Sequence, residues 1–442
     1  MSRTQRIVGL VIGLLVVAAI VLVALNLRGR TEIAASMEAS PSTSSSATPE
    51  ASSGGSSPSQ EASVSGDPSA PTSEEELAIL VQIEEQVAEI RGLEPADIGP
   101  PEIISRVQLG EELRRIFDEE YPLDERERDT IALRAMGLLG PDEDVAELQL
   151  QLLGEDVLGF YDDQEKRMVL VSDSGLDALA KLTYAHEYTH ALQDATFGLD
   201  SLETNADGED DRSLARVALQ EGDASTTMLA WAFANLTQAE LGDLEEPVPG
   251  TADIPSWLEA QLAFPYTYGQ FWASQLAGGD PLAPDFTELD AAYADPPSST
   301  EQIIDINKWS AGEEPLSVEV PGLAAALGEG WEEVDETPVG QASIAITLEF
   351  FGLSVPEAGR AADGWGGDRM VVASGPDDAF ALLWRLEWDA PGEGAEFAEA
   401  YESVVDGVDF AASVRELSDG SVLVVHASSQ ALHDQTLDIA GE

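Results

Sequence analysis

The pattern of apolar and polar positions predicts a mainly helical region followed by a region that mixes helices and strands. In the first region, apolar residues recur at helical spacing, and the predicted helices cover residues 74–92, 102–117 and 126–139. Residues 255–294 are again helical in pattern, with breaks expected at Pro265 and at two glycines. After residue 313 the pattern changes, and the predicted elements are helices at 342–352 and 396–405, strands at 369–373 and 379–388, and a hairpin at 414–425. We therefore expect an α+β fold with two structural parts.

The clearest helical stripe leads into a pair of histidines. Apolar residues from Leu176 onward keep helical spacing up to His186 and His190. Asp173 or Ser174 is expected to cap the start of this helix, and Gly198 to end it. Just upstream, residues 157–161 and 168–171 have the pattern of two short strands joined by a tight turn.

Residues 186–190 read His-Glu-Tyr-Thr-His, in a chain that contains only four histidines. Residues four apart on a helix lie on one face, so His186 and His190 can reach a single Zn²⁺. Glu187 projects near the same point and can act as general base on a water that zinc polarises. The alternative is two surface histidines on an amphipathic helix.

A third ligand is expected, because catalytic zinc sites use three protein ligands. Glu221 lies on the apolar face of a second predicted helix, together with Leu214, Val217, Ala224 and Met228. A buried carboxylate without a partner is costly, and a zinc ion would remove that cost. The alternative is a carboxylate at the edge of the stripe or one paired with Arg216. The adjacent Gly222 suggests close helix packing.

Four further residues are candidates for supporting roles. Asp194 and Asp223 are candidates to orient the histidine rings, although both can equally be solvated acids of a very acidic chain. Tyr266 or Tyr268 can supply a hydroxyl that stabilises an oxyanion, although a core aromatic residue is the more common use.

Three other features have structural interpretations. Ser298 and Glu301 fit a capping box at a helix start. His426 and His433 have no ligand partner at helical spacing, so we interpret both as structural or surface residues.

The His186–His190 motif with its downstream glutamate resembles the gluzincin branch of the zinc metallopeptidases. The longer pattern is similar to an uncharacterised family of membrane-anchored prokaryotic proteins, in the segments Leu158–Tyr161, His186–Asp194, Glu221–Ala224, Pro296–Ile303 and Gly364–Arg369. The resemblance implies a zincin-like catalytic domain with His186, His190 and Glu221 as zinc ligands and Glu187 as base. Relatives carry His-Pro where this chain has Asp305-Ile306, which leaves open an inactive binding or scaffold protein that keeps a structural zinc site.

The net charge of the chain limits its partners and indicates the solvent in which it works. Acidic residues outnumber basic ones by 84 to 21, for a formal net charge of −63. Nucleic acid is therefore excluded as a natural partner, since phosphate binding needs a positive face. Self-repulsion at this level is relieved by salt, which suggests a halophilic source or a salty medium. The alternative is a strongly acidic secreted protein. The chain has no cysteine, so disulfides and thiolate ligands are excluded.

The first residues predict a membrane anchor. Residues 7–27 form an apolar run of a length that matches the hydrocarbon core of a bilayer. A cleaved signal peptide is the alternative. The predicted organisation is an anchor at 1–30, a Ser-, Thr- and Pro-rich disordered linker at 31–73, a zincin-like domain at 74–312 and an α+β module at 313–442.

Together these features predict a single-pass membrane protein with its catalytic part outside the cell. The expected activity is zinc-dependent hydrolysis of peptide bonds, with a peptide or protein as substrate. The sequence does not indicate the oligomeric state.

Overall fold

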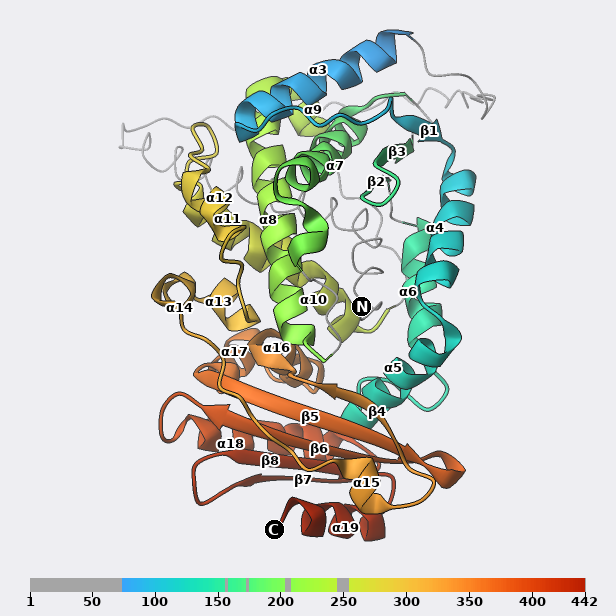
Figure 1. The fold of residues 1–442 in the computed structure, drawn as a ribbon, viewed down its shortest axis with the longest axis vertical. Coiled ribbons are helices and arrows are strands. Elements are labelled where there is room, and N and C mark those ends of the chain that lie inside the picture. The colour runs from blue at the N-terminus through green and yellow to red at the C-terminus, as the bar shows by residue number, and fades with distance from the viewer. Residues whose placement is uncertain (1–73, 156–157, 172–174, 203–207, 245–253, 442) are drawn as a thin grey trace, which may run out of the picture.

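The fold joins a helical upper part to a five-stranded sheet at its lower end (Figure 1). The computed structural model describes residues 74–155, 158–171, 175–202, 208–244 and 254–441. The chain runs from helix α3 (Glu74–Arg91) at the top to helix α19 (Gln430–Ala440) at the bottom. The predicted α+β class, mainly helical at first and mixed afterwards, is confirmed.

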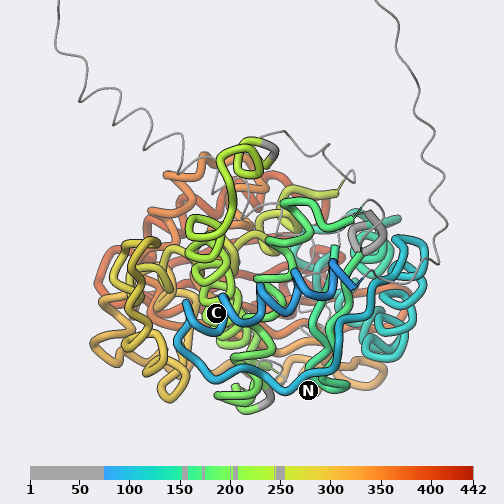
Figure 2. Tube along the Cα trace, turned by 90° about the horizontal axis from the view of Figure 1, so that it is seen from above, coloured from blue at the N-terminus to red at the C-terminus, as the bar shows by residue number. Residues whose placement is uncertain are grey.

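Helix α3 lies across the tops of α7 (Ala178–Phe197) and α8 (Asp210–Asn235), as the view from above shows (Figure 2). Its buried Leu80, Ile83 and Val87 share a hydrophobic cluster with residues of α7 and α8. This helix therefore covers the upper ends of α7, which carries the histidine motif, and of α8.

A small sheet flanks α7. Strand β3 (Arg167–Val171) lies between β1 (Glu102–Ile104), which is parallel to it, and β2 (Gly159–Asp162), which is antiparallel. The two strands predicted upstream of the motif helix are present.

The predicted helix at 102–117 is wrong at its start. Its first residues form β1, where the β-branched Ile103 and Ile104 pair with Leu170 and Val171. Helix α4 (Arg106–Glu120) begins only after Ser105, whose side chain accepts a hydrogen bond from the Gln108 amide. Helices α5 (Leu123–Met136) and α6 (Val145–Glu155) follow.

The motif helix begins and ends at well-defined caps. The Asp177 carboxylate accepts from the Ala180 amide, so Asp177 caps α7 and not Asp173 or Ser174, which lie outside the described residues. Gly198 follows the last turn, as expected, and its amide donates to the Asp194 carbonyl.

Beyond α8 the chain continues through helices that pack on it. After α9 (Gln238–Asp243) come α10 (Ser256–Phe264), the π-helical turn η3 (Pro265–Gly269) and α11 (Gln270–Leu276). Pro265 does not break this run, because the wider π turn accommodates its ring within a continuous helical path. Short helices complete this part: α12 (Thr287–Ala292), α13 (Thr300–Ile304) and α14 (Ile306–Ala311). The predicted capping box at Ser298 is wrong, since Ser299 caps α13 by accepting from the Gln302 amide.

The C-terminal sheet is antiparallel, in the order β4 (Glu332–Thr337), β5 (Trp365–Gly375), β6 (Ala379–Trp388), β8 (Val422–Ala427) and β7 (Ala411–Glu416). Its apolar side chains alternate between two clusters. Helices α16 (Gly340–Phe350), α17 (Val355–Ala362) and α18 (Glu393–Gly407) contribute to one cluster, and α15 (Leu323–Leu327) and α19 to the other.

The upper and lower parts share a core. Side chains of α4, α5, α6 and α10 belong to the same hydrophobic cluster as one face of the C-terminal sheet. His426 on β8 lies in this contact, where its ring Nδ1 donates to the Ala135 carbonyl at 2.8 Å. Its burial lowers its pKa to about 4. His426 is therefore structural, and so is the buried His433, whose Nε2 lies 2.8 Å from the Ser413 hydroxyl.

The predicted anchor at 1–30 and linker at 31–73 lie outside the described residues. Within the described residues, none of the helices combines the length and the apolar character that crossing a bilayer requires.

Candidate metal centre

Helices α7 and α8 bring the four predicted residues into one buried group. His186, Glu187 and His190 come from α7, and Glu221 comes from the middle of α8. Their exposed fractions are 0, 1, 4 and 1 % respectively. Ionisable groups at such depth need compensating partners, such as hydrogen-bond donors and acceptors, one another, or an ion between them.

Three donor atoms form a nearly equilateral triangle. The His186 Nε2 atom lies 3.1 Å from Glu221 Oε2 and 3.2 Å from His190 Nε2. The third side, from His190 Nε2 to Glu221 Oε2, measures 3.4 Å. Three ligands held about 2.1 Å from one ion at tetrahedral angles lie roughly 3.4 Å apart. The triangle thus fits three corners of a zinc tetrahedron, and the two imidazoles and one carboxylate are ligands that zinc accepts.

The tautomer of His190 supports this arrangement. Its Nδ1 lies 2.9 Å from the Gln193 side-chain oxygen, which only accepts, so Nδ1 carries the proton. The Gln193 amide nitrogen in turn donates to the Gln220 carbonyl at 3.0 Å, which fixes the orientation of the amide. The Nε2 atom of His190 therefore faces His186 and Glu221, and it is the ring atom that can bind a metal once it is deprotonated.

Glu187 is held by one oxygen and leaves the other open. Its Oε2 accepts from the Tyr161 amide of strand β2 at 3.0 Å. Its buried Oε1 has no hydrogen-bond partner within the described part of the chain, and the same holds for His186 Nδ1. Unsatisfied buried polar atoms are rare in folded proteins and often mark a site that binds water, an ion or a substrate.

Tyr266 completes the group from η3. It is 2 % exposed, its ring centroid lies 6.1 Å from that of His186, and its hydroxyl donates to Glu221. This approach depends on two glycines, because a Cβ on Gly222 would lie 2.2 Å from the Gly269 carbonyl oxygen, and one on Gly269 would lie 2.3 Å from that of Ala218. The close packing expected at Gly222 is confirmed, and it sets Tyr266 beside the ligands.

The four ionisable groups of the centre have strongly shifted pKa values. Burial raises the pKa of Glu187 to about 8. Burial also opposes ionisation of Glu221, but His190 and His186 overcome it and lower its pKa to about 2. Burial opposes the charged form of His190 as well, but the charges of Glu221 and Glu187 and the hydrogen bonds with Glu221 and Gln193 together outweigh it and raise the pKa of His190 to about 9. Burial lowers the pKa of His186. Perturbation of this kind is typical of functional sites.

Two predicted supporting residues have other partners. Asp194 accepts from the Tyr161 hydroxyl at 2.8 Å and pairs with Lys166. Asp223 pairs with Arg91, at 2.8 Å to its Nε, and accepts from the Tyr293 hydroxyl at 2.8 Å. Neither forms a hydrogen bond to a histidine ring, so their predicted role as ring-orienting partners is wrong.

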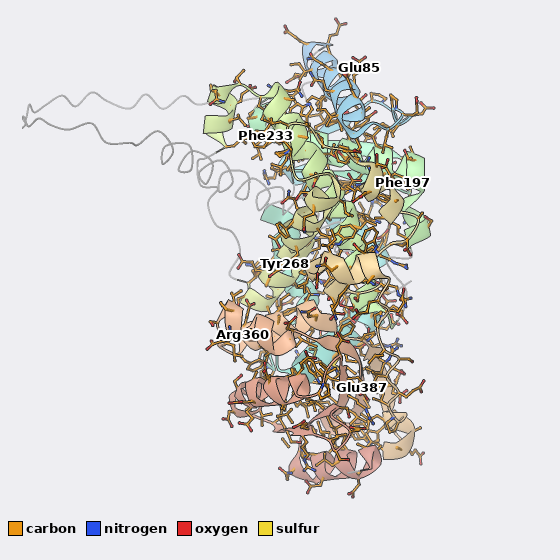
Figure 3. All side chains as sticks on the ribbon, turned by 90° about the vertical axis from the view of Figure 1, so that its left-hand side faces the viewer. Glu85, Phe197, Phe233, Tyr268, Arg360 and Glu387 are labelled. Carbon is orange, nitrogen blue, oxygen red and sulfur yellow. The ribbon has the colours of Figure 1, made fainter. Side chains whose placement is uncertain are left out.

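Tyr268 and Arg216 also lie elsewhere. Tyr268 is 46 % exposed and its ring packs on Phe264 at the molecular surface (Figure 3). Arg216 donates to the Leu202 carbonyl, and the charge partners of Glu221 are the two histidines. Of the supporting residues, sequence reasoning therefore found Tyr266 and missed Gln193, although His190 and Gln193 stand three apart, where helical side chains meet.

A second acidic cluster does not suit a metal. Glu301, Glu313 and Asp389 converge, but the Lys308 ammonium lies between them, 2.6 Å from Glu301 and 2.8 Å from Glu313 and also paired with Asp389. A lysine at the centre of three carboxylates already supplies the positive charge that an ion would bring.

The segments Pro296–Ile303 and Gly364–Arg369 meet at the start of α8. Buried Asp211 accepts from the amide and the hydroxyl of Thr300. Asp368 accepts from the Val339 and Gly340 amides and from two tryptophan ring nitrogens. These segments therefore fasten α8 to the C-terminal part and have no contact with the metal centre in any hydrogen bond of the described residues.

Comparison with known proteins adds one partial match. Residues 327–436 match the sequence model of a family described as a domain of unknown function, DUF8575. No curated protein and no solved structure matches the chain. The matched segment covers the strands of the C-terminal sheet, helices α16, α17 and α18 and part of α19, and it does not include the residues of the candidate metal centre.

Proposed function

We propose that the chain is a zinc-dependent metallopeptidase that hydrolyses peptide bonds. The observation that carries the proposal is the triangle of His186, His190 and Glu221 donor atoms with the open Glu187 oxygen beside it. The placement of the enzyme on the outer face of a membrane, held by residues 7–27, rests on the sequence alone.

Each residue has a defined role in this proposal. His186, His190 and Glu221 would hold the zinc ion, which when bound supplies a positive charge that polarises water and the scissile carbonyl. Glu187 takes a proton from the attacking water at Oε1 and later delivers it to the leaving nitrogen. The open Oε1 of Glu187, with Oε2 held by the Tyr161 amide, is the atom available for this proton transfer. Tyr266 orients Glu221 through its hydroxyl.

The substitution Glu187→Gln tests the proposal. It keeps the side-chain shape and the acceptor for the Tyr161 amide but removes the base. We expect bound zinc to remain and hydrolysis of casein or a peptide library to fall by at least about 100-fold. Glu399→Gln, on an exposed position of α18, is the matched control and should leave turnover unchanged. Equal turnover in Glu187→Gln and the control would exclude this role for Glu187.

A scaffold protein with a structural zinc site is the second candidate. It is favoured by the depth of the centre, since the three ligands are at most 4 % exposed and a substrate needs a path to them. Chelation separates the two functions: loss of hydrolysis with little change in unfolding temperature supports the peptidase, and loss of folding without any hydrolysis in the metal-loaded protein supports the scaffold.

A further inference from the structure

Strand β2 packs along one face of helix α7, beside the candidate metal centre (Figure 1). It packs closely at Gly159, where a Cβ would lie 3.3 Å from the Thr183 side chain. Further along the strand, Tyr161 donates its amide to Glu187 and its hydroxyl to Asp194. Positions 183, 187 and 194 repeat at helical spacing, so a single face of α7 holds the strand.

Tyr161 is held by α7 at two points. The small sheet has the order β1-β3-β2, so β2 is an edge strand, and the Tyr161 amide at this edge donates to Glu187 Oε2 at 3.0 Å. The hydroxyl, at the far end of the same residue, donates to Asp194 Oδ2 at 2.8 Å. Burial and the Asp194 carboxylate both raise the pKa of Tyr161 well above its ordinary value, so the hydroxyl keeps its proton and remains a donor.

Asp194 also reaches the turn that follows β2. Lys166 lies in this turn with a φ of 52°, in the left-handed region that residues with a side chain seldom adopt. Its ammonium group pairs with the Asp194 carboxylate. The Lys166 side chain is 50 % exposed, and an ion pair with so exposed a partner contributes little by itself. The hydrogen bond to the Tyr161 hydroxyl is therefore the contact of Asp194 that fixes the strand.

The position of β2 matters for Glu187, because the Tyr161 amide is the donor that holds its carboxylate. The last torsion of a glutamate side chain is broad and has no sharply preferred angle. A carboxylate held by one donor is therefore oriented only as well as that donor is fixed. If the strand shifts, Oε2 loses its partner and Oε1 is no longer the single open oxygen.

We propose that Asp194 and the Tyr161 hydroxyl are positioning residues for Glu187. They fix β2 on α7, so that the Tyr161 amide stays on Oε2 and Oε1 stays available for proton transfer. This inference rests on the proposed function for its effect on hydrolysis, whereas the hold on the Tyr161 amide can be measured without any activity.

A purely structural role is the alternative, and the chain offers a matched control for it. The Tyr121 hydroxyl donates to Asp129 at 2.5 Å, and Tyr121 is fully buried. This tyrosine–carboxylate pair joins the end of α4 to α5 and does not belong to the helices that carry the metal centre. Tyr121→Phe should therefore lower the unfolding temperature without changing turnover.

Steady-state hydrolysis by the zinc-loaded full chain tests the effect on catalysis. Tyr161→Phe and Asp194→Ala should lower kcat by about 10–100-fold and leave KM and zinc content unchanged. Asp194→Asn keeps an acceptor for the hydroxyl, so it should recover most of kcat. A kcat of Tyr161→Phe equal to that of Tyr121→Phe would overturn the proposal.

Hydrogen exchange measured by NMR tests the hold on the Tyr161 amide. The chain has eight tyrosines, and in the full chain labelled with ¹⁵N-tyrosine the signal that Tyr161→Phe lacks is the Tyr161 amide. Its exchange should become at least about tenfold faster in Asp194→Ala and stay unchanged in Tyr121→Phe. If Asp194→Ala does not fold, the amide at position 161 of Tyr161→Phe is followed with ¹⁵N-phenylalanine and should show the same acceleration.

The two readouts separate this inference from the proposed function. Unchanged exchange at position 161 would overturn the positioning role, whether or not the protein hydrolyses peptides. Faster exchange in a protein whose unsubstituted form hydrolyses no peptide would refute the peptidase function and still support the hold of Asp194 and Tyr161 on Glu187.

Discussion

Two clusters of buried carboxylates lie along helix α8, and they differ in how completely their oxygens are hydrogen-bonded. Near its start, Asp211 accepts from Thr300, and the neighbouring Asp368 accepts from two amides and two indole nitrogens. In its middle, Glu221 faces two imidazoles, and the adjacent Glu187 keeps an open oxygen. Satisfied acids fasten the fold, whereas the incomplete group is the place where we propose that an ion and a substrate bind.

The largest expected effect is the loss of zinc affinity when Glu221 is removed from the incomplete group. Glu221→Ala removes one of three ligands, so zinc affinity should fall by more than the about 10–100-fold that loss of an outer partner causes. Elemental analysis after dialysis measures the remaining metal. The control, Glu399→Ala on α18, should keep its zinc. Normal zinc content in Glu221→Ala would move the third ligand to another residue.

Removing the Asp368 carboxylate from the satisfied group should lower the stability of the fold and leave zinc binding unchanged. Asp368→Ala leaves the Val339 and Gly340 amides and two indole nitrogens without their acceptor. We expect the free energy of unfolding to fall by about 3 kcal/mol or more in urea denaturation. Asp438→Ala, at an exposed position, is the control. A folded Asp368→Ala protein that loses zinc as readily as Glu221→Ala would erase the distinction between the two groups.

These two groups also differ in what the sequence could predict. The histidine motif, the Glu221 helix and its apolar stripe are local patterns, and the structure brings these residues together. The contact of Asp211 with Thr300 joins residues 89 apart in the sequence. Glycine is needed at position 340 beside them, because a Cβ there would lie 1.7 Å from an Asp211 oxygen. No periodicity in the chain signals such a contact.

Errors within short segments have local causes. The strand at Glu102–Ile104 was hidden because its partner, β3, lies more than sixty residues later in the chain. Asp194 is only one of two candidates for orienting a histidine ring, and the helix turn places Gln193 opposite His190.

A smaller effect is expected from the outer partner of His190. Gln193→Ala leaves the Nδ1 proton without its acceptor and the ring less well oriented. Zinc affinity in chelator competition should weaken by about 10–100-fold. Gln82→Ala, at an exposed position of α3, provides the matched control. An affinity equal to that of the control would show that Gln193 does not set the ring.

Asp211, in the satisfied group, should make the free energy of unfolding depend on pH. Burial raises the pKa of Asp211 from 3.8 to about 8, so the folded state keeps a proton that the unfolded state loses. Its contribution to stability is therefore full below about pH 4 and declines as pH rises to about 8. Asp211→Asn should reduce that decline by at least about 1 kcal/mol in denaturation between pH 5 and 8. A decline identical to that of Asp438→Asn would show that Asp211 does not titrate in this window.

The smallest expected effect is that of salt on the unfolding temperature of the whole chain. Screening of a net charge of −63 should raise the unfolding temperature by about 5 °C or more between low and molar salt. Potassium chloride is the suitable salt, since it has little effect on hydrophobic burial. An unfolding temperature that does not rise with salt argues against a halophilic origin.

X-ray absorption at the zinc edge of the purified protein tests the central claim most directly. The account predicts one tightly bound zinc per chain, with two imidazole nitrogens and oxygen ligands at about 2.0–2.2 Å, and loss of this signal in Glu221→Ala. A protein that folds but retains no stoichiometric metal, or one whose metal has no imidazole ligands, would contradict it.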